Sequence, residues 1–301
     1  MKPLISVIVP ARNAEATIGY TLRSIASQQF ESVEVIVVND CSTDSTATTV
    51  LRAAETIPGL RLVDLPQHGG YARGLIAGIA EARGNYMICC DADDSFRPGA
   101  LASLASKAEA TDADMLIAPY IEVRGSKERK ISPHPFASLN DMPLDTVHFA
   151  LWNKLLRLSL IRHNDCMPDA GLDRWADLAI VARFMTLRPQ VATIEEPVYN
   201  YFIRTGAGSL TQSRKQLILN DHLAIARSLL DWMEARGVSE DNTEFIDHLK
   251  FCAKVKYARL PDRDLRAWRR TFPEINSRIL SLRHIPLPYR LLFRLASLLP
   301  G

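Results

Sequence analysis

Short apolar runs alternate with segments of helical hydrophobic spacing along the first part of the chain. Each run is four to six residues long and rich in Val, Ile and Leu, which is typical of a buried strand. The segments between the runs repeat apolar residues with the period of an amphipathic helix. This alternation predicts a parallel or mostly parallel sheet with helices on both of its faces. The predicted strands span residues 4–9, 33–38, 60–65, 86–90 and 115–118.

Polar loops follow the first, second and fourth of these strands, at residues 10–13, 39–46 and 91–94. In open α/β sheets, ligands bind in the crevice outside the carboxyl ends of the strands. We therefore expect these three loops to line a single crevice, and we look there first for the chemistry of the protein.

The loop after the fourth strand is acidic and reads Asp91-Ala92-Asp93-Asp94. Residues two apart on an extended chain point the same way, so the side chains of Asp91 and Asp93 can converge. Two carboxylates on one side suit Mg²⁺ or Mn²⁺. The same stretch also fits a solvated acidic turn, in which Asp94 or Ser95 caps a helix that begins near residue 98. The stretch alone leaves both interpretations open.

The pattern changes after residue 119. Residues 124–135 are charged and contain proline, which indicates a mobile excursion over the crevice. Helical spacing dominates from residue 211 onward. We predict an α/β domain over residues 1–210 and a helical region over residues 211–301. The other expected elements are helices at 152–161, 175–187, 211–237 and 242–258 and short strands at 191–194 and 198–203.

Composition narrows the class of protein. Hydrophobic residues make up 47% of the 301-residue chain and charged residues 23%, as in a globular protein with a sizeable core. The net charge of +2 gives no reason to expect a nucleic-acid partner. Five cysteines without a CxxC pair indicate free thiols in a reducing compartment. The sequence shows neither a signal peptide nor a membrane-spanning apolar run, so we expect a cytoplasmic protein.

Six segments occur in the order in which family 2 glycosyltransferases carry their signatures. The chain resembles this family, and in particular its bacterial cell-surface polysaccharide members. The resemblance implies an α/β protein of the GT-A fold, with a mostly parallel central sheet flanked by helices and a C-terminal helical extension. The matching segments are VIVPARN at 7–13, VVNDCSTDST at 37–46 (usually V-D-D-G-S-x-D-x-T), DADD at 91–94, where the family has its DXD motif, WNKL at 152–155, WADL at 175–178 and YNYFIR…SLT at 199–211.

The resemblance implies a donor site for a nucleotide-diphosphate sugar, with a UDP-sugar as the expected donor. Asp40 would hold the uracil or ribose edge, and Asp44 and the 10–13 loop would shape that pocket. Asp91 would face the ribose, and Asp93 would bind the Mn²⁺ or Mg²⁺ ion that bridges the diphosphate. The wider set implied to contact the donor is Pro10, Arg12, Asn13, Arg73, Ala92, Trp152, Lys154 and Arg204.

Most of these residues also have a purely structural interpretation. Asp40 and Asp44 fit caps for the helix that follows residue 42. Trp152, implied to flank the acceptor or the diphosphate, fits the hydrophobic core equally well. A solvated surface position is the alternative for Arg73, Lys154 and Arg204.

Asp177 is implied to be the general base. It would take the proton from the acceptor hydroxyl as that oxygen attacks the anomeric carbon from the face opposite the leaving group. Direct displacement of this kind inverts the anomeric configuration. Asp173 competes for the role, and a first-turn acid favoured by the helix dipole is the structural alternative for Asp177. The implied acceptor is a glycan or lipid-linked glycan of a cell-surface polysaccharide.

The chain departs from the family pattern at three positions near these motifs. Cys41 replaces a glycine, Gly74 replaces an asparagine, and Ala176 replaces the glutamate beside Asp177. These departures keep a second hypothesis open, namely a catalytically impaired nucleotide-sugar-binding or assembly protein of the same fold.

The C-terminal segment at 283–299 is basic and apolar together, and it is too short to span a membrane. It fits an amphipathic segment lying on the anionic inner face of a membrane, which would make the protein peripheral there. It fits equally well a helix docked on the α/β domain or on the second subunit of a homodimer.

Overall fold

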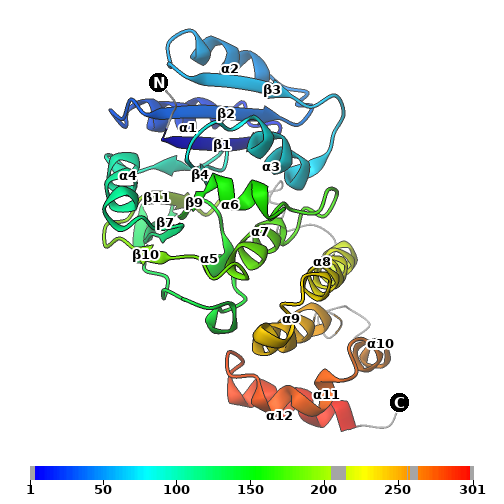
Figure 1. Cartoon of the computed structure of the whole chain (residues 1–301). Helices are drawn as coiled ribbons and strands as arrows, with labels where there is room; N and C mark the ends of the chain where they lie inside the picture. Colours follow the sequence, from blue (N-terminus) through cyan, green and yellow to red (C-terminus); the bar gives the residue numbers. More distant parts are fainter. Residues whose placement is uncertain (1–3, 205–214, 256, 258–263, 299–301) are drawn as a thin grey trace. The chain divides into compact units, whose positions relative to one another are not determined.

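The computed structural model describes residues 4–204, 215–255, 257 and 264–298. The chain divides into two compact units (Figure 1). The first unit combines Met1–Ala137 with Phe149–Thr205, and the second combines Ser138–His148 with Gly206–Gly301. The predicted domain boundary between residues 210 and 211 lies outside the described residues.

A sheet of seven strands, in the order β10-β6-β9-β4-β1-β2-β3, forms the centre of the first unit (Figure 1). All neighbouring pairs are parallel except the two that β9 makes with β4 and β6. The central strands are buried along almost their whole length, as expected for a sheet covered on both faces. The strands are β1 (Ile5–Ala11), β2 (Val33–Asn39), β3 (Leu60–Asp64), β4 (Tyr86–Cys89), β6 (Met115–Ile117), β9 (Lys154–Arg157) and β10 (Val191–Thr193).

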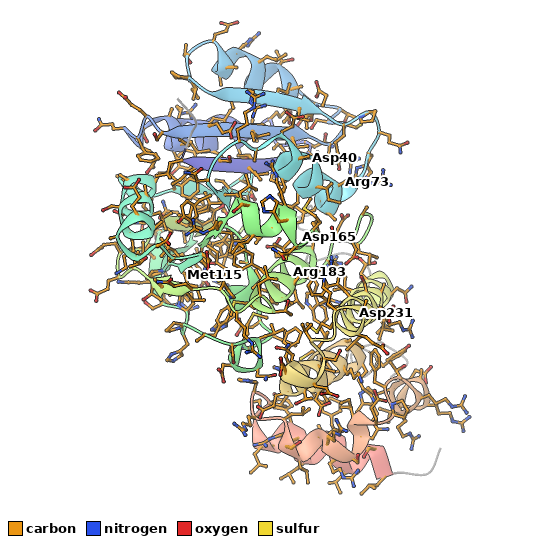
Figure 2. All side chains as sticks on the ribbon, viewed as in Figure 1. Asp40, Arg73, Met115, Asp165, Arg183 and Asp231 are labelled. Carbon is orange, nitrogen blue, oxygen red and sulfur yellow. The ribbon has the colours of Figure 1, made fainter. Side chains whose placement is uncertain are left out.

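Helices connect these strands as the hydrophobic spacing predicts. Among them, α3 packs on β1 and β2. Gly78 makes this close approach possible, because a Cβ there would meet the Ile8 side chain at 2.4 Å. Figure 2 places Asp40 and Arg73 at the same end of α3, beside the carboxyl end of the sheet. The helices are α1 (Ile18–Ala26), α2 (Thr46–Ala54), α3 (Gly70–Glu81), α4 (Ala100–Thr111), α5 (Thr146–Phe149), α6 (Leu158–His163) and α7 (Ala176–Met185).

The prediction of a helix over residues 152–161 is wrong for the first half of that range. Residues 154–157 form β9, which lies antiparallel between β4 and β6, and only then does α6 begin. Leu155 and Leu156 are fully buried in this strand. Their place between two strands that are distant in sequence outweighs the local helical spacing, since strand preference depends mainly on such surroundings.

A second, smaller sheet has the order β5-β11-β7-β8. The charged stretch at 124–135 contains β8, which pairs antiparallel with β7, so it is a hairpin strand rather than the predicted excursion over the crevice. β11 pairs with both β7 and β5 and thereby binds the chain after the acidic loop to residues far along the sequence. The strands are β5 (Ser95–Phe96), β7 (Tyr120–Arg124), β8 (Lys127–Ile131) and β11 (Tyr199–Phe202).

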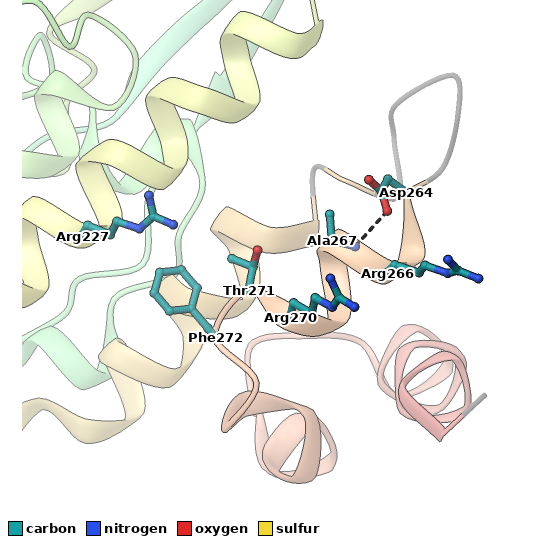
Figure 3. Close-up of a pocket in the computed structure, with 7 residues that line it drawn as sticks. All are labelled: Arg227, Asp264, Arg266, Ala267, Arg270, Thr271 and Phe272. Carbon is teal, nitrogen blue, oxygen red and sulfur yellow. Dashed lines mark hydrogen bonds between the residues drawn. The ribbon is translucent and has the colours of Figure 1, made fainter. Parts of the chain in front are cut away.

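The second unit is helical, as predicted for the C-terminal region. A cavity of about 580 Å³ lies between residues of α8 and α10 (Figure 3). Arg227, Arg266 and Arg270 are among the residues that line it. The elements are η1 (Leu139–Asp141), α8 (Lys215–Ala235), η3 (Glu240–Asn242), α9 (Thr243–Lys254), α10 (Leu265–Arg270), α11 (Ile275–Arg278), η5 (Ile279–Ser281) and α12 (Leu287–Leu298).

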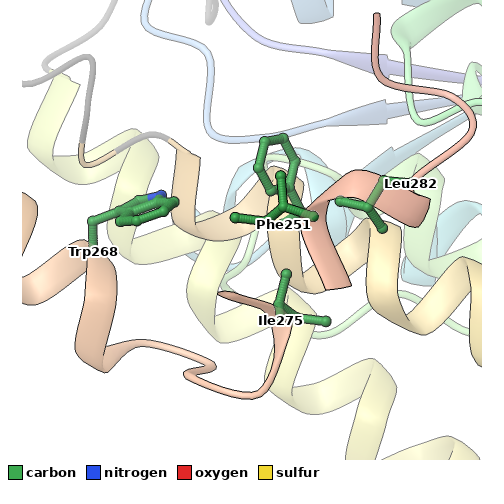
Figure 4. Close-up of a cluster of buried hydrophobic side chains, with 5 residues drawn as sticks. Phe251, Trp268, Ile275 and Leu282 are labelled. Atoms are coloured by element: carbon green, nitrogen blue, oxygen red, sulfur yellow. The ribbon is translucent and has the colours of Figure 1, made fainter. Parts of the chain in front are cut away.

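A hydrophobic cluster of its own holds the second unit together (Figure 4). Lys254 is fully buried at its edge, where its Nζ donates to Asn276 Oδ1 at 2.7 Å and lies 4.4 Å from the centroid of the Trp268 ring. Within the described ranges, no helix has both the length and the apolar character needed to cross a membrane. The cluster consists of Phe251, Trp268, Ile275, Ile279 and Leu282.

Candidate active site

The acidic loop at the end of β4 is fixed from two sides. The backbone N–H of Asp91 donates to the Tyr199 hydroxyl of β11 at 2.9 Å. On the other side, the Ala92 carbonyl accepts hydrogen bonds from the hydroxyls of Thr17 and Thr21, at 2.9 and 3.1 Å. The loop therefore has one defined shape, set by α1 and by the small sheet.

Asp94 points into the protein. Its Oδ1 accepts the backbone N–H of Phe202 at 2.8 Å, whereas its Oδ2 is buried and has no hydrogen-bond partner in the part of the chain that the structure describes. Burial raises the pKa of Asp94 to about 7, although the Phe202 hydrogen bond and the charge of Arg204 lower it. The capping alternative for Asp94 and Ser95 is wrong, because α4 begins at Ala100 after Gly99.

Asp93 points outward and pairs with Arg204. The two side chains are about half exposed, and Arg204 Nη1 lies 2.6 Å from Asp93 Oδ2. The Nη2 of the same guanidinium donates to the Asp93 backbone carbonyl. The guanidinium also lies over the Phe202 ring, 5.3 Å from its centroid. The structure thus brings together two residues that are 111 positions apart and that the sequence assigned to the same donor site.

Asp177 lies in the first turn of α7, and its charge raises the pKa of Asp91. Its Oδ2 accepts the backbone N–H of Leu151 at 3.3 Å, and its Oδ1 is buried without a hydrogen-bond partner among the described residues. Burial raises the pKa of Asp177 to about 6, against the lowering effects of the Tyr71 hydroxyl, the Leu151 amide and Lys154. One oxygen of this carboxylate therefore accepts no hydrogen bond from a described residue, and with a pKa of about 6 the group is mostly ionised at neutral pH.

Asp40 is tied to the start of α3. Its Oδ1 accepts the Gly69 backbone N–H at 2.7 Å, and its Oδ2 accepts the Gly70 backbone N–H at 2.9 Å and contacts His68 Nδ1 at 2.7 Å. The carboxylate is almost completely buried. Asp40 therefore fixes the loop that leads into α3, and its contacts match the structural role that the sequence left open, although with a different helix.

Asp173, from a distant part of the chain, binds a further N–H group at the start of α3. Its Oδ1 accepts the backbone N–H of Ala72 at 3.0 Å, and its carboxylate lies where a Cβ of Gly70 would be. A carboxylate at this place satisfies an unpaired N–H of the first helical turn and is favoured by the helix dipole. Asp173 thereby anchors the turn that carries Tyr71 toward Asp177.

The loops after β1 and β2 are joined by direct hydrogen bonds. Asn13 Oδ1 accepts the Thr43 backbone N–H at 2.9 Å. Asp44 Oδ1 accepts the Thr46 backbone N–H at 3.0 Å, at the first residue of α2, as its structural interpretation predicts. Cys41, in place of the family's glycine, adopts the left-handed conformation with φ of 50°. The turn therefore keeps the backbone region that glycine favours.

The remaining candidates differ in exposure. Arg12 and Arg73 are exposed, and Pro10 is half-buried. Gly74 packs on Pro10, because a Cβ there would lie 3.2 Å from the proline Cβ. This contact brings α3 against the loop after β1.

Trp152 and Lys154 lie beneath the acidic loop. Trp152 is only 4% exposed, and its ring stacks on Tyr199 and Tyr201 at centroid distances of 5.0 and 5.3 Å. Lys154 is fully buried, and its Nζ donates to the Ala150 carbonyl at 2.8 Å. The aromatic stack supports Tyr199, which in turn accepts the hydrogen bond from Asp91.

A metal ion fits the acidic loop only if a bound phosphate-containing ligand supplies part of its coordination. Among the described residues, no group of three or more His, Cys, Asp or Glu side chains can hold a metal by itself. Burial, followed by the charges of Asp94, Asp177 and Asp93, raises the pKa of Asp91 well above its usual range. Such crowded carboxylates, one of them exposed, suit a hard cation that takes its remaining ligands from phosphate oxygens.

Tyr71 and Asp94 are the site residues that the sequence did not identify. Tyr71 has a pKa well above its usual value because it is buried and because Asp177 and Asp91 face it. Its only signal in the sequence is its position directly after two glycines at a helix start. Asp94 was visible as an acid of the loop, but not as the inward-pointing one.

The fold is that of the GT-A glycosyltransferases. The model of the glycosyl transferase family 2 matches residues 6–167, and the chain belongs to this family. The succinoglycan biosynthesis protein ExoO of Rhizobium meliloti is 27% identical over 218 residues, which cover 68% of this chain and 62% of ExoO. The chain thus matches somewhat less than two thirds of that relative's length.

Solved structures with little sequence identity show the same fold. S. aureus TarS 1–349 in complex with UDP-GlcNAc has a TM-score of 0.64 at 16% identity, covering 98% of this chain and 89% of that one. The mannosyltransferase PcManGT from Pyrobaculum calidifontis, in complex with GDP-Man and Mn²⁺, has a TM-score of 0.55 at 17% identity, with coverages of 99% and 86%.

Proposed function

We propose that this protein is a metal-dependent, inverting glycosyltransferase of bacterial cell-surface polysaccharide synthesis. It moves a sugar from a UDP-sugar to a hydroxyl of a glycan or lipid-linked acceptor, at the cytoplasmic side of the membrane. The observation that carries the proposal is the buried Oδ1 of Asp177, which has no hydrogen-bond partner among the described residues and whose carboxylate acts electrostatically on Asp91 at the carboxyl end of β4. Ligands of open α/β sheets bind at this end of the strands.

Asp177 acts as the general base. Its carboxylate takes the proton of the acceptor hydroxyl while the hydroxyl oxygen forms a bond to the anomeric carbon. The bond between that carbon and the diphosphate oxygen breaks, and UDP leaves with the electron pair. The pKa of about 6 suits this role, since the group is ionised at neutral pH and still basic enough to hold the proton.

The donor lies along the loops after β1, β2 and β4. Asp91 faces the ribose, and Pro10, Arg12 and Asn13 shape the nucleotide pocket with Asp40 behind it. Arg73 and Arg204 supply positive charge to the diphosphate. A divalent cation held by Asp93 would neutralise the charge that develops on the departing diphosphate. Ala92, Trp152 and Lys154 support the loop from its backbone and from below.

The known proteins that resemble this chain support a nucleotide-sugar donor, and TarS supports the choice of UDP. TarS was solved with UDP-GlcNAc, and PcManGT was solved with GDP-Man and Mn²⁺. ExoO is named for succinoglycan biosynthesis. Two of the three departures give no support to the alternative of an impaired binding protein, because Cys41 adopts the left-handed conformation that glycine favours and Asp177 lies in the first turn of α7 beside Ala176.

Nucleotide binding is the first test. We expect UDP with Mn²⁺ to raise the melting temperature by several degrees, because a ligand that binds only the folded state stabilises it. The part of the shift that depends on Mn²⁺ should vanish in Asp93→Ala and persist in Asp231→Ala, which removes an exposed acid of α8. GDP, CMP and dTDP serve as comparisons. If no nucleotide stabilises the folded wild type, the proposal fails.

Turnover is the second part of this test. A screen of UDP-sugars for slow hydrolysis identifies the donor. The anomeric configuration of a transferred sugar, determined by NMR, tests inversion: retention of configuration would contradict the role of Asp177 as a base in direct displacement.

The pair of Arg204 and Asp93 predicts opposite effects on metal and nucleotide. In Arg204→Gln, Asp93 loses its competing cation, so the Mn²⁺ concentration for half-maximal stabilisation by UDP should fall by about two- to fivefold, the range of an exposed ion pair. Binding of the metal thus becomes tighter. The affinity for UDP at saturating Mn²⁺ should instead become weaker, because a contact with the diphosphate is lost. Titration calorimetry measures both effects.

Arg124→Gln is the matched control, because Arg124 forms an exposed ion pair with Glu122 on β7. It should change neither quantity. An Arg204→Gln protein with unchanged requirements for both Mn²⁺ and UDP would show that Arg204 is only a surface arginine.

A further inference from the structure

The last helix of the second unit exposes a continuous apolar face. In α12, five leucines recur along one side of three helical turns, as the period of 3.6 residues places them. Each is about half exposed or more, although isolated exposed leucines are the usual case in a soluble protein. These leucines, which we call the leucine stripe, are Leu287 (53%), Leu291 (48%), Leu292 (60%), Leu295 (65%) and Leu298 (63%).

The other side of α12 holds the helix to its own unit. Phe293 and Ala296 pack against the hydrophobic cluster of this unit, and the Phe293 ring lies edge-on to Phe251 at 5.3 Å. Arg294 Nη1 adds a hydrogen bond to the Asn276 carbonyl at 2.8 Å. The helix therefore docks through its narrower apolar side, and the leucine stripe faces away from the core of its unit.

The sequence around the stripe carries positive charge only. From residue 275 to residue 301 there is no Asp or Glu, whereas four arginines occur. Arg278 and Arg283 pair with Asp247 and Glu244 of α9, whereas Arg290 and Arg294 of α12 form no ion pair with a residue in the described ranges. Arg227, Arg266 and Arg270 line the cavity of Figure 3 together with Asp264. The four arginines are Arg278, Arg283, Arg290 and Arg294.

We propose that the leucine stripe with its arginines is a docking surface for an anionic lipid bilayer. Leucines of such a helix enter the boundary between headgroups and acyl chains, while arginines at its margin stay with the lipid phosphates. The twelve residues of α12 are too few to cross the bilayer, so the helix lies in its surface.

A second copy of the chain suits this surface less well. A symmetric contact would place the same arginines opposite one another, and α12 has no acid to compensate them. The stripe is also only about 18 Å long, as a helix of twelve residues dictates. A stable dimer takes about 800 Å² from each partner, more than one short stripe can supply. Charge and area together favour the bilayer.

Docking of this kind would hold the enzyme at the surface where lipid-linked acceptors reside. The binding rests on the leucine stripe and the arginines near it and does not depend on the proposed transfer reaction. Its readout is vesicle binding, so a failure here would leave the proposed function standing, and the reverse also holds.

Vesicle co-sedimentation of the full chain tests the proposal. We expect binding to vesicles that contain about a third phosphatidylglycerol, weak binding to pure phosphatidylcholine, and a loss of binding at high salt. The double variant Leu291→Ser/Leu295→Ser should bind the anionic vesicles at least about tenfold more weakly, because two side chains no longer leave water.

The matched control is Tyr20→Ser/Leu51→Ser, which removes two exposed apolar side chains of α1 and α2 in the first unit. It should bind as the wild type does. Leu291, Leu295 and Leu51 are exposed, so their replacement should keep the wild-type melting temperature. The Tyr20 ring also lies edge-on to Phe202 at 5.9 Å, so the control should melt a few degrees lower and still bind the vesicles as the wild type does. A wild type that ignores anionic vesicles would overturn the proposal, as would a double variant that binds like the wild type. A dimer in light scattering that only Leu291→Ser/Leu295→Ser dissociates, without vesicle binding, would assign the stripe to a second copy instead.

Discussion

Replacing Asp177 with asparagine should lower kcat by about 10²–10⁴, the usual contribution of a positioned general base. Asparagine has nearly the same shape and can still accept the Leu151 N–H through its carbonyl oxygen, so the fold should be kept. The stabilisation by UDP and Mn²⁺ should also remain, because Asp177 does not belong to the donor loops. Steady-state kinetics together with the thermal-shift assay separate the two effects.

Asp173→Asn is the control that decides between the two acids. The amide oxygen of asparagine can still accept the Ala72 N–H, so this variant should lose less than about fivefold in kcat. If Asp173→Asn is the inactive variant and Asp177→Asn is active, the assignment of the base is wrong.

The rate should also depend on pH through Asp177. Burial raises its pKa from the usual value of 3.8 to about 6. Because the base must be ionised to accept a proton, kcat/KM should be constant above that value and fall about tenfold per pH unit below it. Asp177→Asn should abolish this acid limb. A wild-type profile that is flat down to pH 4.5 would exclude a base with this pKa.

Gly70→Ala should lower the free energy of unfolding by about 2–4 kcal/mol. The residue has a φ of 81°, which costs a residue with a Cβ about 1–2 kcal/mol. In addition, the new Cβ would lie 2.2 Å from Asp173 Oδ2, so the carboxylate must move and give up its hydrogen bond from Ala72, a loss of about 1–2 kcal/mol. Urea unfolding measures the change.

Gly125→Ala separates the two causes. Gly125 has a positive φ of 58°, but nothing lies within 4 Å of its added Cβ. The free energy of unfolding of this variant should therefore fall only by the cost of the positive φ, about 1–2 kcal/mol. Equal losses at both glycines would mean that Asp173 is not held against the start of α3. Gly70→Ala should also slow turnover, because Tyr71 is the next residue and faces Asp177.

Much of the sheet could be predicted from the sequence because its central strands are apolar along their length. The parallel strands β1 to β4 and the helices between them follow directly from the local hydrophobic period. The predictions at β8 and β9 were wrong because both strands are set by their partners. β9 joins β4 and β6, and the charged β8 is a strand only through its pairing with β7. Hydrophobic spacing contains no information about such partners.

The candidate site shows the same division. The loop at Asp91 and Asp93 and the acid Asp177 were recognisable as local motifs, and the structure brings all three to the end of β4. The contact of Asp173 with Ala72 joins residues 101 positions apart, and no local pattern announces it. The inward turn of Asp94 depends likewise on the Phe202 N–H, 108 positions away.

The crowded acids at the end of β4 have a consequence for the stability of the empty protein. Asp94 binds a proton more tightly in the folded state than in the unfolded chain, since its pKa rises from 3.8 to about 7. By linkage, the free energy of unfolding falls as pH rises between these two values, and near pH 7 almost all of the contribution from Asp94 has been lost. The protein thus carries an electrostatic penalty in its resting form, and a cation at this loop would relieve it. Resistance to proteolysis should therefore rise when a cation occupies the acidic loop. The ligand-free protein would be the form that a cell's proteases degrade first.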